Sequence, residues 1–163
     1  MGNQTIYALS TVFGKSGVAV FRISGKNAIE AIKKLSDINS DNIQPRRAYF
    51  SKLHGIDNLP IDHAVVVYFK SPHSFTGEDI VEISSHGSKA VISSLLSNLS
   101  QIDGFRLAEA GEFSKRAFYN NKMDLTEAEG LADLIDAETS EQQKYALRQM
   151  DGELKNLYDG WRS

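Results

Sequence analysis

The sequence predicts an α+β fold, in which a mostly antiparallel sheet with packed helices is followed by C-terminal helices. Short runs rich in Val, Ile, Phe and Tyr have the length of strands, and only two amphipathic stretches interrupt them, so strands and helices do not alternate as in a parallel sheet. The last third is rich in Ala and charged residues, which is typical of helices. The strand-like runs are residues 5–10, 18–23, 47–54, 64–70, 80–84 and 104–107.

A glycine-bracketed segment separates the first two strands. Gly14-Lys15-Ser16 matches the end of the phosphate-binding loop of nucleotide-binding proteins, but Leu9 stands where that loop requires its first glycine. The segment also leads into a strand rather than a helix. We therefore expect a hairpin turn, whose backbone N–H groups remain candidates for binding an anion.

Two helices are predicted from apolar side chains that recur every three or four residues. The first helix follows Gly25 and the second follows Gly87. The apolar positions of the first are Ala28, Ile29, Ile32 and Leu35. Those of the second are Val91, Ile92, Leu95, Leu96, Leu99 and Ile102.

The fifth predicted strand, residues 80–84, contains a charged residue, Glu82, among apolar neighbours. Turn residues at 57–60 and 71–74 separate the strands that precede it. Because side chains alternate along a strand, Glu82 shares a face with Ile80, while Val81 and Ile83 face the other way. A carboxylate with such neighbours either lies on an open face or is held by a specific partner.

The chain after Gly111 has a helical pattern. A change to acidic, Ala-rich composition at residues 120–124 predicts a domain boundary, and Thr126 with Glu129 has the spacing of a capping box. A further helix has an apolar seam with a period of 3.5 residues, which one helix cannot bury alone. We expect its partner in another subunit, in the preceding domain or beyond residue 163. The seam consists of Leu147, Met150, Leu154, Leu157 and Trp161.

Composition excludes several classes of function. The chain has no Cys, its four His residues lack helical pairing, and no Ser lies in a G-x-S-x-G motif, so we expect neither a metal site nor a catalytic residue. The net charge of −3 argues against strong binding to a phosphate backbone, although residues 1–60 carry eight basic and four acidic side chains. No apolar run reaches the roughly 18 residues of a membrane span, and because the first residues have neither the basic nor the apolar region of a signal peptide, we expect no secretory signal. We therefore expect a cytoplasmic protein without membrane contact.

Three segments contain more polar and charged residues than packing requires, and they predict an interaction surface. They are residues 21–25, 74–79 and 111–118, the last running on to residue 125. Together with neighbouring stretches they resemble, in order and at the same spacing, the N-terminal part of the TrmE/MnmE family of bacterial tRNA-modification GTPases. The stretches that carry the resemblance are residues 5–8, 17–25, 74–79, 82–87, 111–118 and 124–137.

The resemblance implies a domain organisation. Residues 1–118 resemble the family's tetrahydrofolate-binding and dimerisation domain, which is similar to tetrahydrofolate-binding aminomethyltransferases. Residues 119–163 resemble the beginning of a helical domain, truncated here. In the family that helical domain holds an inserted GTPase domain that uses GTP with Mg and K ions. That domain is absent from this sequence, so we expect this chain alone to be inactive as a GTPase.

The resemblance also implies a ligand and partners. Arg22, Glu82 and Lys122 match the family's contacts to 5-formyltetrahydrofolate or a related one-carbon tetrahydrofolate. A carboxylate such as Glu82 can accept the paired N–H donors of a pterin, and the two cations can donate to its oxygens or to the glutamate tail. The implied partners are a second copy of the chain, a flavin-containing enzyme of the MnmG/GidA type, and tRNA modified at its wobble uridine.

Three positions depart from the family pattern. Val12 and Ala110 replace frequent prolines, and Ser88 replaces a frequent glycine. None of them is a mapped folate contact, but Ser88 and Ala110 could change the stiffness of loops. An alternative therefore stays open: a dimerisation scaffold or interaction module that no longer depends on folate.

Overall fold

The computed structural model of the protein describes residues 4–11, 16–124 and 126–127. Its backbone divides into two compact units, residues 1–110 and 111–163. The boundary predicted between residues 118 and 119 remains a prediction. Among the described residues, no helix is both long enough and apolar enough to span a membrane.

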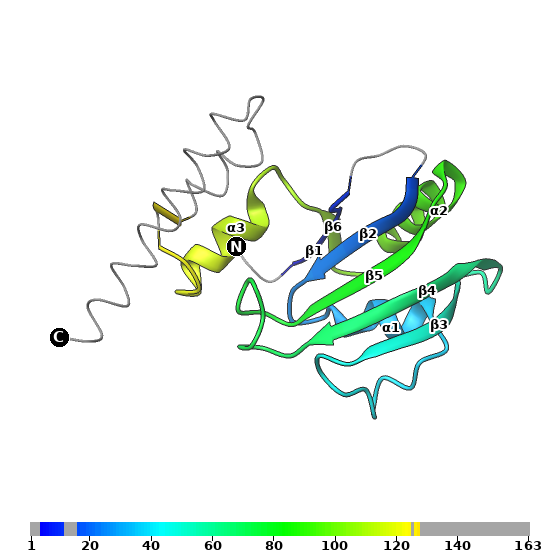
Figure 1. Ribbon diagram of the computed structural model, residues 1–163, viewed down its shortest axis with the longest axis horizontal. Helices are drawn as coiled ribbons and strands as arrows, with labels where there is room; N and C mark the ends of the chain where they lie inside the picture. Colours follow the sequence, from blue (N-terminus) through cyan, green and yellow to red (C-terminus); the bar gives the residue numbers. More distant parts are fainter. Residues whose placement is uncertain (1–3, 12–15, 125, 128–163) are drawn as a thin grey trace. The chain divides into compact units, whose positions relative to one another are not determined.

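The first unit contains a mixed six-stranded sheet with the order β3-β4-β5-β2-β1-β6 (Figure 1). Neighbouring strands are antiparallel, except that β1 and β6 are parallel. The predicted α+β class with a mostly antiparallel sheet is therefore confirmed for this unit, and the last strand lies at an edge as expected. The strands are β1 (Thr5–Leu9), β2 (Ser16–Ser24), β3 (Ala48–His54), β4 (Pro60–Phe69), β5 (Ile80–Gly87) and β6 (Phe105–Leu107).

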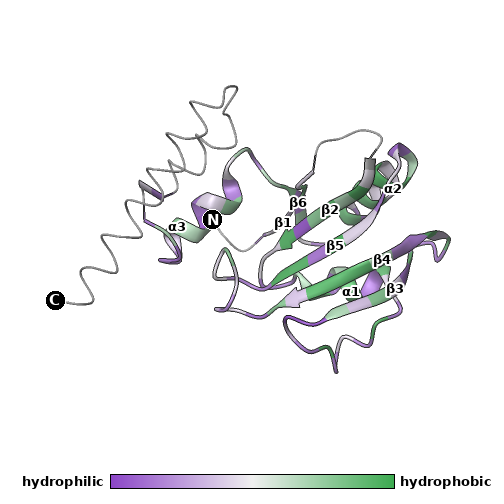
Figure 2. Cartoon of the chain, viewed as in Figure 1, coloured by the Kyte–Doolittle hydropathy of each residue, from purple (hydrophilic) through white to green (hydrophobic). Residues whose placement is uncertain are grey.

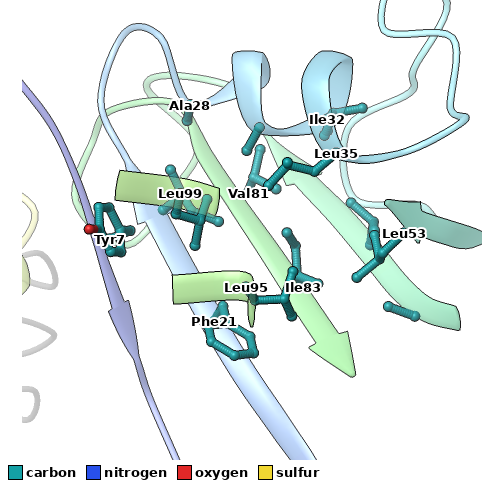
Figure 3. Close-up of a cluster of buried hydrophobic side chains, with 14 of the residues drawn as sticks. Tyr7, Phe21, Ala28, Ile32, Leu35, Leu53, Val81, Ile83, Leu95 and Leu99 are labelled. Carbon is teal, nitrogen blue, oxygen red and sulfur yellow. The ribbon is translucent and has the colours of Figure 1, made fainter. Parts of the chain in front are cut away.

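Two helices pack on the same face of this sheet (Figure 1). They are α1 (Ile29–Leu35) and α2 (Lys89–Ser100), and their buried side chains come from the predicted apolar stripes. Figure 3 shows these side chains meeting those of the central strands in one core. The core residues that it labels include Phe21, Ile32, Leu35, Val81, Ile83, Leu95 and Leu99.

β4 and β5 extend by three or four residues beyond their predicted ends, and β2 extends by two residues at its start and one at its end. β4 begins at Pro60 instead of residue 64, and β5 runs on to Gly87 instead of ending at residue 84. The added residues are largely polar, so no apolar run marks them. They are held instead by pairing with neighbouring strands, as between Ser16 and Gly87, and by hydrogen bonds from His86 to Asp62.

Ser88 caps the second helix. Its Oγ accepts a hydrogen bond from the backbone N–H of Val91 at 3.1 Å, and its backbone is extended, as an N-cap requires. At this position a glycine, frequent in the family, would provide no side-chain acceptor. The serine that replaces the family's frequent glycine therefore stabilises the start of α2.

The second unit contains α3 (Glu112–Tyr119), which confirms the helical pattern predicted just after Gly111. Arg116 lies one turn after Glu112 and forms an ion pair with it at 3.5 Å. Beyond α3, Asp124 Oδ1 accepts a hydrogen bond from the backbone N–H of Glu127 at 2.7 Å. The capping box of Thr126 and Glu129 depends on a residue outside the described ones, and the apolar seam lies outside them entirely.

Gly25, directly after β2, has a backbone that other residues rarely adopt. Its φ is +147°, and a Cβ atom there would lie 2.5 Å from Thr5 Oγ1 and 2.8 Å from Thr5 Cα. We predict that Gly25→Ala lowers the free energy of unfolding by about 2–4 kcal/mol, because strain and a backbone clash add together. Urea unfolding measures this loss.

Gly104 provides the matched control. Its φ is also positive, at +79°, but no atom lies within 4 Å of the corresponding Cβ position. Gly104→Ala should therefore lower the free energy of unfolding by only about 1–2 kcal/mol, the cost of the left-handed backbone alone. Equal losses in the two variants would contradict the role assigned to the contact with Thr5.

Asp62 predicts how stability depends on pH. Burial raises the pKa of this carboxyl, but hydrogen bonds from the His86 backbone and ring and from the His63 backbone outweigh it, so the pKa lies below its usual 3.8. Because its pKa is lower in the folded than in the unfolded state, ionised Asp62 stabilises the fold above pH 3.8. This stabilisation is lost as the pH falls through the pKa of Asp62 in the folded protein. We predict that Asp62→Asn destabilises the protein at pH 7 and that the difference from the wild type shrinks below pH 3.8. A difference that stays constant down to pH 3 would contradict this assignment.

Candidate functional site

An ion pair across two central strands forms the centre of the candidate site. Antiparallel pairing of β2 with β5 places Arg22 directly opposite Glu82. Arg22 Nε and Nη2 each lie 3.2 Å from Glu82 Oε1, and the two side chains are 31% and 29% exposed. Both point to the second face of the sheet, opposite α1 and α2, because Phe21, Ile23, Val81 and Ile83 occupy the core face. Glu82 therefore both lies on an accessible face and is held by a specific partner.

Phe75 brings an aromatic ring to this pair. The guanidinium carbon of Arg22 lies 5.5 Å from the ring centroid of Phe75, within the range of a cation–π interaction. Phe75 is itself partly exposed, and it belongs to the loop that joins β4 to β5. Two of the three segments predicted as an interaction surface, residues 21–25 and 74–79, thus meet in the fold.

Hydrogen bonds tie this loop to the end of β2. Ser24 Oγ lies 2.7 Å from Thr76 Oγ1 and donates to Glu78 Oε1 at 2.9 Å. Neither Ser24 nor Thr76 is accessible to solvent. The backbone carbonyl of Asp79 accepts from Gly25 N at 2.9 Å, so the loop has a second attachment beside the first.

The base of the loop is also held by polar contacts. Asp79 Oδ1 accepts a hydrogen bond from the backbone N–H of Ser71 at 2.8 Å, which closes the loop across its two ends. Burial, together with the charge and hydrogen bonding of Asp79, raises the pKa of the Tyr68 hydroxyl, so Tyr68 stays a neutral donor at physiological pH. The loop therefore holds Phe75 on a framework with fixed ends.

The pair can bind a ligand that has both donors and acceptors. Arg22 contacts Glu82 through Oε1, with both Nε and Nη2, and no described residue donates to Oε2. Glu82 can therefore accept a further hydrogen bond without losing Arg22, and Phe75 adds an apolar surface for a planar ring. Because a pair exposed to this degree contributes only about 0–1 kcal/mol to stability, its presence is not explained by the fold alone.

Lys122, the third predicted contact, lies in the second unit just after α3. It is exposed, and its backbone N–H donates to the carbonyl of Ala117 at 2.8 Å. The segment surrounds a hollow of about 540 Å³ with both aromatic and charged sides. Of the three predicted residues, the structure brings Arg22 and Glu82 together. The lining residues of the hollow are Phe118, Tyr119, Asn121, Lys122, Met123, Asp124 and Glu127.

Sequence reasoning missed the individual roles of Phe75, Thr76 and Ser24. Two of them belong to the predicted segment 74–79, but nothing in the pattern assigns a buried hydroxyl or a ring over a guanidinium to one position. A signal was present in Ser24, a hydroxyl at the end of β2 directly before Gly25. The anion-binding turn considered at Gly14 lies outside the described residues.

Three of the four histidines have local side-chain partners. His86 Nδ1 lies 2.9 Å from Asp62 Oδ1, His54 Nε2 lies 3.6 Å from Asp37 Oδ1, and the ring of His63 stacks on Phe50. In the part of the chain that the structure describes, no group of three or more His, Cys, Asp or Glu side chains could hold a metal ion.

Comparisons with known proteins agree with the motifs that meet at this site. The family model described as the N-terminus of the GTP-binding protein TrmE matches residues 5–122. The chain is 57% identical over 161 residues to the tRNA modification GTPase MnmE of Rickettsia bellii and 54% identical to that of Rickettsia typhi. These alignments cover 98% of this chain and 36% of each relative, so the chain spans about a third of the length of the curated relatives it matches.

The matched region includes Arg22, Phe75, Glu82 and Lys122 together with every strand and helix of the first unit. The match extends over more than half of the chain, and the relatives share its residues at high identity. The chain therefore belongs to the TrmE N-terminal family.

Proposed function

We propose that this chain is the part of a tRNA-modification GTPase that binds a one-carbon tetrahydrofolate and forms a homodimer. The observation that carries the folate proposal is the Arg22–Glu82 pair beside Phe75 on the second face of the sheet. The relatives are named tRNA modification GTPases, and the chain aligns to them over nearly all of its own length. The domain proposed for both roles is residues 1–118, followed by the start of a helical domain.

The chemistry of the pair suits a tetrahydropterin. The amino-pyrimidine edge of a pterin presents adjacent N–H donors, which a carboxylate can accept. Glu82 has Oε2 for that purpose while Arg22 keeps it in place through Oε1. The ring of Phe75 offers an apolar contact to the fused ring, and the Arg22 guanidinium offers donors to carbonyl or formyl oxygens.

Lys122 is proposed as the third contact to the folate. A lysine provides a flexible point charge for the formyl oxygen or for the carboxylates of the glutamate tail. Its position in a hollow with two aromatic side chains, Phe118 and Tyr119, supports a role in binding an organic anion. Because Lys122 is exposed, its contribution to affinity should be smaller than that of Glu82.

The remaining roles belong to the proposed parent protein. There a GTPase domain would use GTP with Mg and K ions, and a flavin-containing partner would act with it on the wobble uridine of tRNA. This proposal places the protein in the cytoplasm and assigns no catalytic residue to this chain. Its contribution is to hold the one-carbon folate and to pair two subunits.

The second face of the sheet supports the homodimer. A row of side chains crosses four strands there, from Phe50 through Val65 and Ser84 to Val20. Phe50 is 75% exposed, and Val65 and the nearby Val18 are exposed as well. Figure 2 shows hydrophobic residues along β2 and β4, the strands that contribute Val20 and Val65 to this row. Exposed apolar area of this kind is typical of protein interfaces.

A scaffold that pairs subunits without folate is the second candidate. The same apolar row favours it, because dimerisation needs no ligand. The Arg22–Glu82 pair distinguishes the two, since a pure scaffold gives it no role. Folate titration therefore decides between the candidates.

We predict that the chain binds 5-formyltetrahydrofolate and that Glu82→Ala weakens binding about 5- to 150-fold. Buried pterin donors left without an acceptor cost about 1–3 kcal/mol, and each 1.4 kcal/mol is about tenfold in affinity. Arg22→Ala should have an intermediate effect and Lys122→Ala the smallest. Calorimetry with the 163-residue chain measures all three.

Arg106→Ala is the matched control for this series, because Arg106 is a partly exposed arginine of β6 that hydrogen-bonds Gln4 at 2.8 Å. It should bind as tightly as the wild type. Tight binding that survives all three site substitutions would contradict the site assignment, and no binding at millimolar folate would favour the scaffold.

We also predict that Val65→Glu raises the dissociation constant of the homodimer at least about tenfold, because it places a charge in the apolar row. Leu59→Glu is the control, since Leu59 is 64% exposed but precedes β4 in a turn. Sedimentation equilibrium of the full chain measures both. Unchanged association of Val65→Glu would exclude this face as the interface.

A further inference from the structure

We infer that Ser24, Thr76 and Glu78 form a positioning network that fixes Phe75 against Arg22 and so orients the Arg22–Glu82 pair for its ligand. The inference rests on the proposed folate site for its biological role. The geometry on which it depends is that of the protein without ligand.

The three residues close a ring of hydrogen bonds. Glu78 donates its backbone N–H to Thr76 Oγ1 at 3.2 Å, and Ser24 donates its hydroxyl to Glu78 Oε1 at 2.9 Å. Since the Ser24 proton is directed at the carboxylate, the 2.7 Å contact between the two hydroxyls is donated by Thr76. Within this ring each hydroxyl donates once and accepts once, so its geometry is specific.

The ring joins two segments that are far apart in sequence. Ser24 and Thr76 are separated by 52 positions, and both are completely buried. Moving the loop away from β2 would break both the Ser24–Thr76 and the Ser24–Glu78 hydrogen bonds, and the loss of buried hydrogen bonds is costly. The network therefore fixes the loop relative to the end of β2.

Each end of the network is next to a residue of the site. Ser24 lies two residues after Arg22 on the same strand, and it therefore shares the second face with Arg22. Thr76 directly follows Phe75. Fixing Ser24 to Thr76 consequently fixes the ring of Phe75 relative to the guanidinium, which lie 5.5 Å apart.

Packing alone does not explain how the Phe75 ring is held at its position beside Arg22. Phe75 and the side chains of Arg22 and Glu82 all remain partly exposed, so the position of the loop is not set by burial of the ring. The rest of the loop satisfies its polar groups locally, as Ser71 Oγ does by donating to the carbonyl of Gly77 at 2.8 Å. The buried ring of hydrogen bonds is thus what determines the direction of Phe75.

The first test reads this geometry in the protein without ligand. Arg22 Nε donates to Glu82, and the nearby aromatic ring shifts the NMR resonance of its Hε proton. We identify the resonance by its absence in Arg22→Lys and define the unstacked position with Phe75→Leu. In Thr76→Val, which has the same shape but no hydroxyl, the resonance should move most of the way to the Phe75→Leu position.

Conservative variants distinguish positioning from folding. Thr76→Ser keeps the hydroxyl and should keep the wild-type resonance, whereas Ser24→Ala opens the ring from the β2 side and should reproduce Thr76→Val. If Thr76→Val does not fold, Ser24→Ala decides. A folded variant of either kind with the resonance at its wild-type position would overturn the inference.

The second test links the network to binding. Thr76→Val and Phe75→Leu should each weaken 5-formyltetrahydrofolate about tenfold, and the double variant should be no weaker than the single ones. Lower thermal stability with unchanged affinity, or fully additive losses, would overturn the positioning role. If the wild type binds no folate, the proposed function fails, while the NMR test still decides whether the network orients Arg22.

Discussion

The register of β2 against β5 is the constraint on which both the core and the site depend. Phe21 and Ile23 face Ile83 and Val81 on the side covered by the helices, and the same alternation sets Arg22 opposite Glu82 on the other side. A slip of β2 by one residue would turn Arg22 toward the core, away from Glu82, and would expose Phe21 and Ile23 on the second face. The energy of the core thus fixes the position of a pair that contributes little stability itself.

The sequence predicts most of the first unit because its elements follow hydrophobic periodicity. The α+β class, two helical stripes, the edge strand and the opposite orientations of Glu82 and Ile83 all follow from that pattern. The ends of β4 and β5 do not, because their polar residues are held by pairing and by Asp62 rather than by apolar burial. The N-cap at Ser88 does not follow from periodicity either, because the sequence marks this residue only by its difference from the family pattern.

The candidate site is predicted less completely than the fold. The resemblance supplies Arg22 and Glu82, and the register explains why they meet. The ring of Phe75 and the buried hydroxyls of Ser24 and Thr76 depend on how one loop folds onto a strand 52 positions away, which no local pattern encodes. The register of the sheet positions the charged pair, and the loop between β4 and β5 adds an aromatic surface beside it.

A crystal structure of the chain with 5-formyltetrahydrofolate tests the central claim most directly. The account predicts the amino-pyrimidine edge of the pterin within about 2.7–3.2 Å of Glu82 Oε2, with Arg22 still bound to Oε1 and Phe75 against the fused ring. Folate bound away from the second face of the sheet, with the Arg22–Glu82 pair untouched, would contradict it.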